Sequence, residues 1–143
     1  MAHRSRGVGR RAASSPRALV LDADGLTKAA GGDPRVRAYV TRARETDADI
    51  FVSTLTLTET LRGKSSDAKI HGLLKGAYRV PVSEDIARAA GELLGTLGRR
   101  DAVDAVVSVT AHSLESSVLL LTSDPKDLGE LTQTYPRVQV VCI

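Results

Sequence analysis

Four carboxylates stand out because each lies at the end of an apolar segment or inside one. Asp22 ends the stretch ALVLD, and Asp124 ends SVLLLTSD. Glu59 follows the apolar stretch ADIFVS within a few residues, and Asp104 lies in the apolar run DAVDAVVSV. An ionised carboxylate in apolar surroundings costs free energy unless it is paired or bound to a metal. These acids are therefore the first candidates for chemistry.

Carboxylates that converge on one place repel each other and raise each other's pKa, unless a divalent cation lies between them. Basic partners near Asp104 are few, since only Arg99 and Arg100 precede it closely. Mg²⁺ and Mn²⁺ suit hard oxygen ligands. A cation held by carboxylates can activate water or stabilise a leaving oxygen in phosphodiester hydrolysis. The predicted metal ligands for Mg²⁺ or Mn²⁺ are Asp22, Glu59, Asp104 and Asp124.

Each acid taken alone has a simpler interpretation. Asp22 or Asp24 resembles a helix cap, and Asp104 resembles a first-turn residue that interacts with the helix dipole. Glu59 resembles a solvated helix residue, and Asp124 precedes Pro125 as at an ordinary helix start. Only the joint pattern, with one acid for each expected strand end, favours the metal site.

The segments that must position these acids alternate between strand and helix patterns. We expect strands at 18–22, 48–53, 78–83, 117–124 and 138–143. We expect helices from near Asp24 and at 34–44, 54–63, 66–75, 83–98 and 101–115, with a short one after Pro125. Alternation of apolar strands with helices predicts an α/β fold, with a mostly parallel sheet covered on both faces. Ligands of such sheets bind beyond the carboxyl ends of the strands.

Charge is distributed unevenly along the 143 residues. Residues 1–17 contain five of the 20 basic residues and no acid, so the other 126 residues carry 15 basic and 17 acidic side chains. We expect 1–17 to be a basic, disordered extension and 18–143 to be the single folded domain. The lone cysteine, Cys142, fits a cytoplasmic protein. No apolar run approaches the roughly 20 residues of a membrane span, so no membrane association is expected.

At this point the sequence resembles a known family. The blocks LVLDADGL, VSTLTLTETLRG, DAVDAVVSVTAHS and VLLLTSDPKDL resemble, in order and spacing, the four motif blocks of PIN-domain ribonucleases. The helix pattern VSEDIARAAGELLGTLG before the third block strengthens the similarity to VapC-type toxins within that superfamily. The resemblance covers about residues 18–143.

The resemblance implies a Mg²⁺- or Mn²⁺-dependent endoribonuclease with a three-layer α/β/α fold and a sheet of about five strands. It implies that Asp22, Asp104 and Asp124 are the principal metal ligands and that Glu59 completes the acidic pocket. It also implies an RNA substrate, a VapB-like antitoxin as partner, and a homodimer. Ala23 and Asp24 depart from the family, which commonly has a hydroxyl residue after the first Asp and Asn or Ser next.

Two alternatives remain open. The stretch LVLDADGL is also close to the D-x-D-G signature of haloacid-dehalogenase-like phosphatases, with Asp22 as nucleophile and Asp24 as acid and base. Against this, only 20 residues follow Ser123, and Glu59 and Asp104 are left without a role. The second alternative is a catalytically degenerate domain that binds RNA or a partner without cutting. A histidine-based ribonuclease would need His71 or His112, of which His112 is interpreted as structural.

Overall fold

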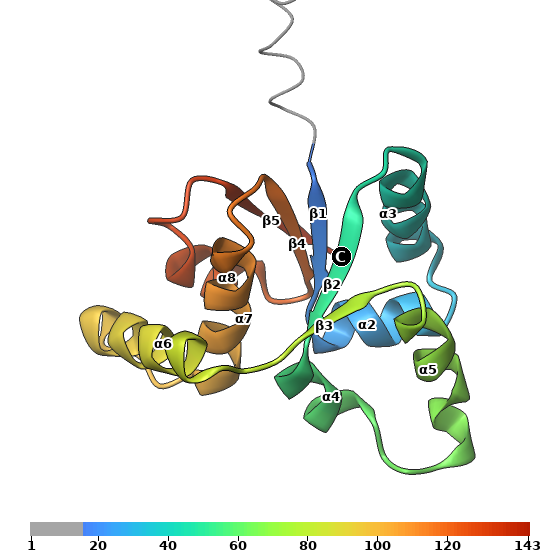
Figure 1. The fold of residues 1–143 in the computed structure, drawn as a ribbon, viewed down its shortest axis with the longest axis horizontal. Coiled ribbons are helices and arrows are strands. Elements are labelled where there is room, and N and C mark those ends of the chain that lie inside the picture. Colours follow the sequence, from blue (N-terminus) through green and yellow to red (C-terminus); the bar gives the residue numbers. More distant parts are fainter. Residues whose placement is uncertain (1–15) are drawn as a thin grey trace, which may run out of the picture.

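Five parallel strands form the central sheet of the computed structural model, which describes residues 16–143 (Figure 1). The strands are β1 (Ala18–Leu21), β2 (Asp49–Ser53), β3 (Tyr78–Val80), β4 (Val118–Thr122) and β5 (Val138–Cys142). Their order across the sheet is β3-β2-β1-β4-β5, and every neighbouring pair is parallel. The predicted α/β class is confirmed, and the sheet is wholly rather than mostly parallel.

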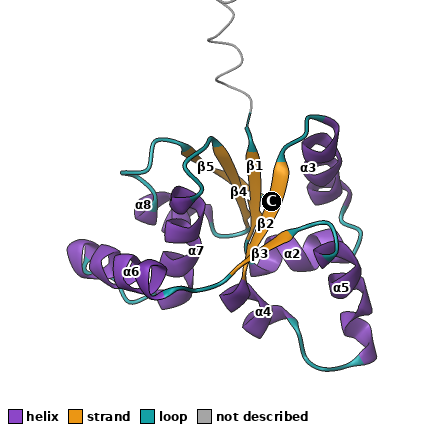
Figure 2. Ribbon diagram, in the orientation of Figure 1, coloured by secondary structure: helices purple, strands orange, loops and turns teal. Residues whose placement is uncertain are grey.

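Two groups of helices cover the two faces of this sheet (Figures 1 and 2). One face carries α2 (Ala23–Ala30), α3 (Pro34–Glu45) and α5 (Ala68–Leu74), and the other carries α6 (Glu84–Leu97), α7 (Ala102–Ser113) and α8 (Pro125–Leu131). The remaining helix, α4 (Thr54–Thr60), lies at the edge where β1 and β2 end, and a 3₁₀ turn, Ser65–Asp67, precedes α5. The arrangement is the predicted three-layer α/β/α fold.

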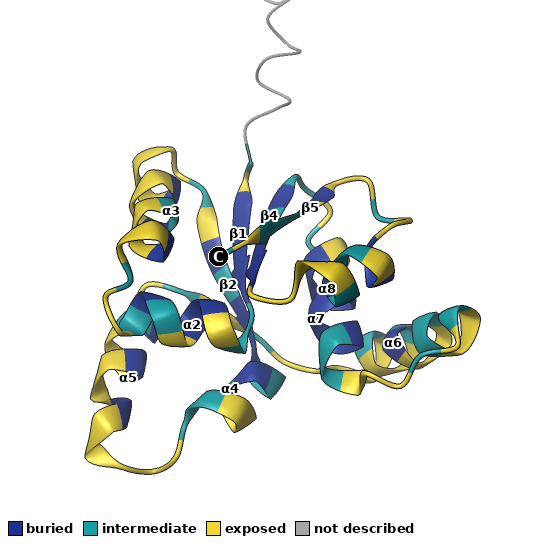
Figure 3. Ribbon diagram, turned by 180° about the vertical axis from the view of Figure 1, so that it is seen from behind, coloured by how far each residue is buried: buried dark blue, intermediate teal, exposed yellow. Residues whose placement is uncertain are grey.

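Alternation along β1 shows how one strand serves both layers. Successive side chains of a strand point to opposite faces. Ala18 and Val20 pack in the cluster under α7, whereas Leu19 and Leu21 pack in the cluster under α2 and α3. All four side chains are buried, as the dark strands of Figure 3 show. A strand buried on both faces reads as an uninterrupted apolar run, which is why the sequence predicted it correctly.

Helix α4 ends earlier than expected. The sequence predicted a helix to Gly63, but Leu61 already has an extended backbone, with φ −88° and ψ 140°. The N–H groups of Arg62 and Gly63 donate to the carboxylate of Asp67 instead, at 2.9 and 2.7 Å. Asp67 is buried, with 6% of its surface exposed. A local side-chain acceptor therefore competes with the helix for these backbone donors.

The third strand lies at one edge of the sheet, as predicted from Pro81. The strand ends at Val80, one residue before this proline, because proline has no N–H for the ladder. Within residues 16–143, no helix is long and apolar enough to cross a membrane.

The start of the domain differs slightly from its expected boundary. Arg17, placed in the extension by the sequence, donates its backbone N–H to Ser117 O at 2.9 Å, and its carbonyl accepts from Asp49 N at 3.1 Å. Arg17 therefore already takes part in the backbone hydrogen bonds at the start of β1. The prediction of disorder for the preceding basic residues, 1–15, lies outside the described residues.

Candidate metal centre

The four predicted acids lie on elements that meet at the carboxyl edge of the sheet, at the bottom of Figure 1. Asp22 directly follows β1, and Asp124 is the N-cap of α8 just beyond β4. Asp104 is in the first turn of α7, and Glu59 lies in α4, which directly follows β2. All strands are parallel, so their ends bring these segments to the same edge.

Asp22 is held in a defined orientation at the end of β1. Leu21 is in register with Leu121, so Asp22 and Thr122 are the next residues along two paired strands. Gly25 donates its N–H to Asp22 Oδ1 at 2.8 Å, and the Thr122 hydroxyl also donates to this carboxylate. Burial is the largest influence on Asp22 and raises its pKa, and the negative charges of Asp24 and Glu59 raise it further, although the two hydrogen bonds act against this rise.

Thr122 connects two of the candidate ligands. Its side chain is fully buried, and its Oγ1 accepts the backbone N–H of Asp124 at 2.9 Å while the hydroxyl donates to Asp22. One hydroxyl thus fixes the carboxylate of one acid and the backbone of the other. This is the kind of hydrogen bond that orients a metal ligand from behind.

Gly25 is required by close packing. A Cβ at this position would lie 3.2 Å from Leu121 O and 3.4 Å from Asp22 Oδ1. The first turn of α2 therefore approaches β4 so closely that a side chain would crowd the backbone of Leu121. This approach places the Gly25 N–H against the carboxylate of Asp22.

Among the described carboxyl groups of this region, that of Asp104 has the most strongly raised pKa. Its side chain is half-buried, and burial together with the charges of Asp101, Asp124, Asp22 and Asp127 raises its pKa to about 6. Asp104 is therefore close enough to Asp22 and Asp124 for their negative charges to raise its pKa. A divalent cation would lower the free energy of this set of carboxylates by neutralising them.

Glu59 is the most loosely connected of the predicted ligands. Its side chain is exposed on α4, and its charge is felt by Asp22. Asp24, whose role the sequence left open, is also exposed, and it accepts a hydrogen bond from the Ser123 hydroxyl. Asp24 is therefore tied to the loop after β4 and contributes negative charge to Asp22 from outside.

A second acidic group lies on the other side of Asp104. Carboxylate oxygens of Asp101, Asp104 and Asp127 lie within 4.8 Å of one another. Arg99 already neutralises two of them, since its Nη2 lies 2.7 Å from Asp101 Oδ2 and 2.8 Å from Asp127 Oδ1. The hydrogen bond from Arg99 is the main reason that the pKa of Asp127 is lowered. The same guanidinium also binds Glu130, so Arg99 offsets part of the negative charge beside Asp104.

His112 does not belong to the acidic site. Its side chain is exposed near the end of α7 and stacks on Tyr135, with ring centroids 4.0 Å apart and planes 9° apart. The opposite end of α7 carries Asp104. The stacking on Tyr135 agrees with the interpretation of His112 as a structural residue.

The sequence missed Thr122, Gly25 and Arg99. Thr122 had a weak signal, since it is the one polar residue in the strand VLLLT. Gly25 follows an acid pair at a strand end, where a close approach of helix and strand is common. The sequence placed Arg99 close to Asp104 but not its contact with Glu130, because Glu130 lies 31 residues away and is brought near only by the packing of α8.

A class of protein follows from these features: an α/β domain with an all-parallel sheet and a carboxylate cluster at its carboxyl edge. Among protein families, the PIN domain model matches residues 19–131. The chain therefore belongs to the PIN domain family, as the resemblance implied. PIN-domain proteins are nucleases, which supports hydrolase activity and leaves the phosphatase alternative without support. The sequence has no match among curated proteins.

Solved structures with the same fold come from toxin–antitoxin complexes. A chain of VapBC2 from Rickettsia felis bound to a DNA fragment from their promoter superposes with a TM-score of 0.67 and 14% identity, covering 88% of this chain and 98% of that one. A toxin–antitoxin complex from Klebsiella pneumoniae gives 0.65 and 20%, covering 87% and 99%. VapBC-1 from nontypeable Haemophilus influenzae gives 0.65 and 18%, covering 87% and 97%. The likeness extends over essentially the whole PIN fold.

Proposed function

We propose that this chain is a Mg²⁺- or Mn²⁺-dependent endoribonuclease and the toxin of a VapBC-type toxin–antitoxin pair. The observation that carries the proposal is the carboxylate set at the sheet edge, with Asp22 and Asp104 raised in pKa by burial and by neighbouring acids. The donor set consists of hard oxygens without histidine or cysteine, which fits Mg²⁺ or Mn²⁺.

Asp22, Asp104 and Asp124 would hold the cation, and Glu59 would complete the negative rim on the side of α4. When bound, the cation supplies charge stabilisation at the phosphate and lowers the pKa of water. Hydrolysis adds the oxygen of water to phosphorus and releases the RNA oxygen on the opposite side. The chain's own contribution is to fix the ligands: Gly25 N–H and Thr122 hold Asp22, and Thr122 holds the Asp124 backbone.

The fold and the family support the proposed partners. Solved neighbours include a toxin–antitoxin complex and VapBC complexes, some with DNA. A VapB-like antitoxin and a homodimer of this chain are accordingly part of the proposal, as is a cytoplasmic location. A degenerate PIN domain that binds RNA without cutting it is the competing function, and activity measurements separate the two.

The direct test is cleavage of single-stranded and structured RNA by the purified protein with EDTA, Mg²⁺ or Mn²⁺. We expect cleavage only with a divalent cation, and loss of cleavage by a factor of at least about 10² in Asp104→Asn. Asp85→Asn is the matched control, because Asp85 is also in the first turn of a helix but is fully exposed. Cleavage in EDTA, or full activity of Asp104→Asn with an intact circular-dichroism spectrum, would contradict the mechanism. Absence of cleavage with retained RNA binding would favour the degenerate domain.

A further inference from the structure

A basic cavity lies between α2, α3 and α5, the helices that cover one face of the sheet. It is an open depression with a volume of about 460 Å³, and three cationic side chains line it: Arg37 and Arg44 from α3, and Lys69 from α5. No acidic residue of the described chain lines it. Gly31 and Gly32 after α2 form part of its wall, which keeps the backbone accessible there.

These cations are unpaired. Within residues 16–143, the side chains of Arg37, Arg44 and Lys69 form no hydrogen bond or ion pair with the protein, although four carboxylate–arginine contacts occur elsewhere. The guanidinium of Arg44 reaches the loop after α5, since its Nη2 lies 3.2 Å from the position that a Cβ on Gly76 would take. Like charges gathered around one cavity repel each other, so an anion at this place would stabilise them.

The cavity and the acidic site lie at opposite ends of one helix. Asp22 caps the N-terminus of α2, and Gly31 follows its last residue. The helix has eight residues, and at 1.5 Å per residue it spans about 12 Å. Phosphates of a stacked strand follow one another at about 3.4 Å along the axis. A nucleic acid strand reaching both places would therefore extend over only a few nucleotides.

A nuclease with an acidic catalytic site needs cationic side chains elsewhere on its surface to bind RNA. Carboxylates at the sheet edge repel the phosphates of RNA until a cation is bound, and the folded body carries net negative charge. Affinity for a polyanion must then come from cations placed outside the acid cluster. Arginine is well suited to this, because its planar guanidinium binds phosphate through two parallel hydrogen bonds.

We propose that the cavity lined by Arg37, Arg44 and Lys69 is a phosphate-binding subsite for RNA that flanks the cleaved bond. The proposal rests on the proposed ribonuclease function and extends it by assigning where the substrate backbone is held. The bound group is a phosphodiester of the same strand, a few nucleotides from the acids.

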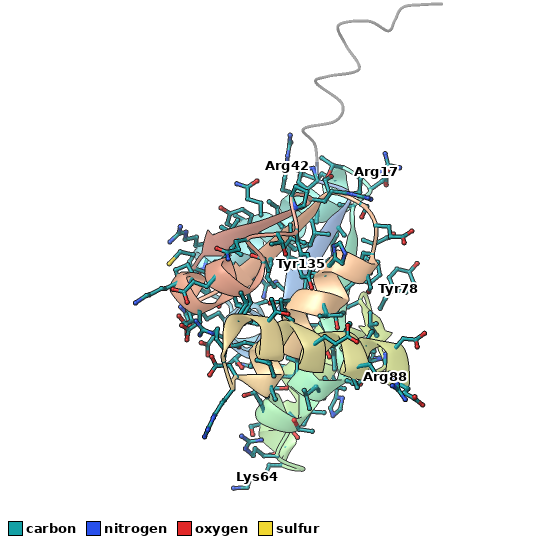
Figure 4. The ribbon with its side chains drawn as sticks, turned by 90° about the vertical axis from the view of Figure 1, so that its left-hand side faces the viewer. Arg17, Arg42, Lys64, Tyr78, Arg88 and Tyr135 are labelled. Carbon is teal, nitrogen blue, oxygen red and sulfur yellow. The ribbon has the colours of Figure 1, made fainter. Side chains whose placement is uncertain are left out.

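Helix α3 itself provides a matched control. Arg37 and Arg44 are seven residues apart and share one face of α3, and Arg35 and Arg42 have the same spacing on a face turned by about 200°. Arg42 lies at the end of the molecule where β1 begins, opposite Lys64 (Figure 4). The double variants Arg37→Gln/Arg44→Gln and Arg35→Gln/Arg42→Gln change the net charge equally on exposed positions of one helix.

The experiment measures binding of fluorescein-labelled oligouridylate by anisotropy at several salt concentrations, in the Asp104→Asn protein without divalent cation. Loss of two phosphate contacts reduces the slope of log K against log salt by about 1.4 for a single strand. We expect this reduction, with weaker binding, for Arg37→Gln/Arg44→Gln and no change for Arg35→Gln/Arg42→Gln. In otherwise wild-type protein, Arg35→Gln/Arg42→Gln should keep the kcat for cleavage of a dinucleotide, because these two arginines lie outside the cavity.

A steric variant tests the cavity without changing charge. Gly72 lines it, and a Cβ there meets no atom within 4 Å, so Gly72→Leu fills the space. Gly91 in α6 is equally open and lies outside the cavity, which makes Gly91→Leu the control. We expect weaker RNA binding only for Gly72→Leu.

Three outcomes would overturn the subsite. Equal loss in both arginine pairs would indicate diffuse electrostatic attraction, and no loss in either would exclude RNA from the cavity. Loss of binding to a polyglutamate peptide with unchanged RNA affinity would assign the cavity to an acidic protein segment. Because binding is measured without cleavage, failure of the ribonuclease proposal appears only in the cleavage assay and is distinguishable from failure of the subsite.

Discussion

Thr122 orients Asp22 from the neighbouring strand. The family commonly has a hydroxyl residue directly after the first acid, and Ala23 cannot supply that hydrogen bond. In this chain, Thr122 donates to Asp22 from the neighbouring strand, and Gly25 donates from the first turn of α2. The orientation of the carboxylate is therefore secured by residues on two other segments.

Removing this hydroxyl has a defined consequence. Thr122→Val leaves Asp22 with one hydrogen bond fewer and the Asp124 N–H without its acceptor. We expect the concentration of Mn²⁺ needed for half-maximal activity to rise by about 10- to 100-fold, the usual effect of losing a group that orients a metal ligand.

Two controls accompany this variant. Thr122→Ser should restore most of the affinity, since it keeps the hydroxyl. Thr132→Val removes another buried hydroxyl, bonded to Leu128 O, and should leave metal dependence unchanged. An unchanged Mn²⁺ requirement in Thr122→Val would show that the hydroxyl does not orient the ligands.

The raised pKa of Asp104 predicts a pH dependence for the metal-free protein. Its pKa is about 6 in the fold against an ordinary value of 3.8, so folding disfavours the ionised form. The stability contributed by the protonated group is present below about pH 4 and is lost as the pH rises through about 6.

Comparison with Asp104→Asn isolates this effect. In urea denaturation with EDTA, we expect the free energy of unfolding of the variant to rise relative to that of the wild type between pH 4 and pH 7. The relative rise should be about 1–2 kcal/mol after allowance for the exposed half of the side chain. Saturating Mg²⁺ should remove the wild type's deficit at pH 7. A stability difference that does not change with pH would contradict the raised pKa.

At the scale of the elements, strand ends and caps place the acids. Asp22 is both the end of β1 and the N-cap of α2, and Asp124 caps α8. The simpler interpretation of Asp22 and Asp124 as residues at helix starts is therefore correct. The two roles are compatible, because a capping carboxylate uses one oxygen for the backbone and keeps further lone pairs for a ligand.

The turn between α4 and α5 depends on Asp67. Burial acts to raise the pKa of its carboxyl, but the N–H groups of Arg62, Gly63 and Lys64 lower it more, and the pKa lies below its ordinary value. The stabilisation from such a group is present above the unfolded pKa of about 3.9 and is lost as the pH falls through the folded value.

We expect Asp67→Ala to lower the melting temperature by several degrees at pH 7, because the partly buried hydrogen bonds from Arg62 and Gly63 lose their acceptor. The difference from wild type should shrink below about pH 4. The melting temperature of Asp67→Asn, which keeps one acceptor oxygen, should lie between those of the wild type and Asp67→Ala. Asp85→Ala, on the exposed start of α6, should leave the melting temperature unchanged. Equal melting temperatures of Asp67→Ala and wild type would show that the turn forms without this carboxylate.

Much of the element pattern was predictable from sequence, for physical reasons. Strands β1 and β4 are buried on both faces, so their composition alone reveals them. The end of α4 was not predictable, because the competing acceptor Asp67 follows after a loop. The ion pairs of Arg99 with Asp127 and Glu130 also depend on tertiary packing, which no local pattern encodes.

At the scale of the whole molecule, charge is separated between the two ends of α2. Carboxylates gather where β1 and β4 end, and unpaired arginines and a lysine gather beyond the other end of the helix. A polyanionic substrate would thus be held by the cations and cut beside the acids. The basic residues before Pro16 lie outside the described part of the chain.

The family and the fold constrain this picture. The match to the PIN domain model covers residues 19–131, which include all four predicted acids. The position of the acids at one edge could be predicted because parallel strands deliver their ends there; their role as metal ligands stays a prediction. The cavity could not, since Arg37, Arg44 and Lys69 come from two helices whose packing decides which faces meet.

The central claim is that Asp22, Asp104 and Asp124 together bind a divalent cation. Calorimetric titration of the metal-free protein with Mn²⁺ at pH 7 tests it most directly, with Asp85→Asn as the charge-matched control for Asp104→Asn. The account predicts saturable binding to the wild type and to Asp85→Asn, and at least about tenfold weaker binding to Asp104→Asn. Equal Mn²⁺ affinity of all three proteins, or no binding to the wild type, would contradict it.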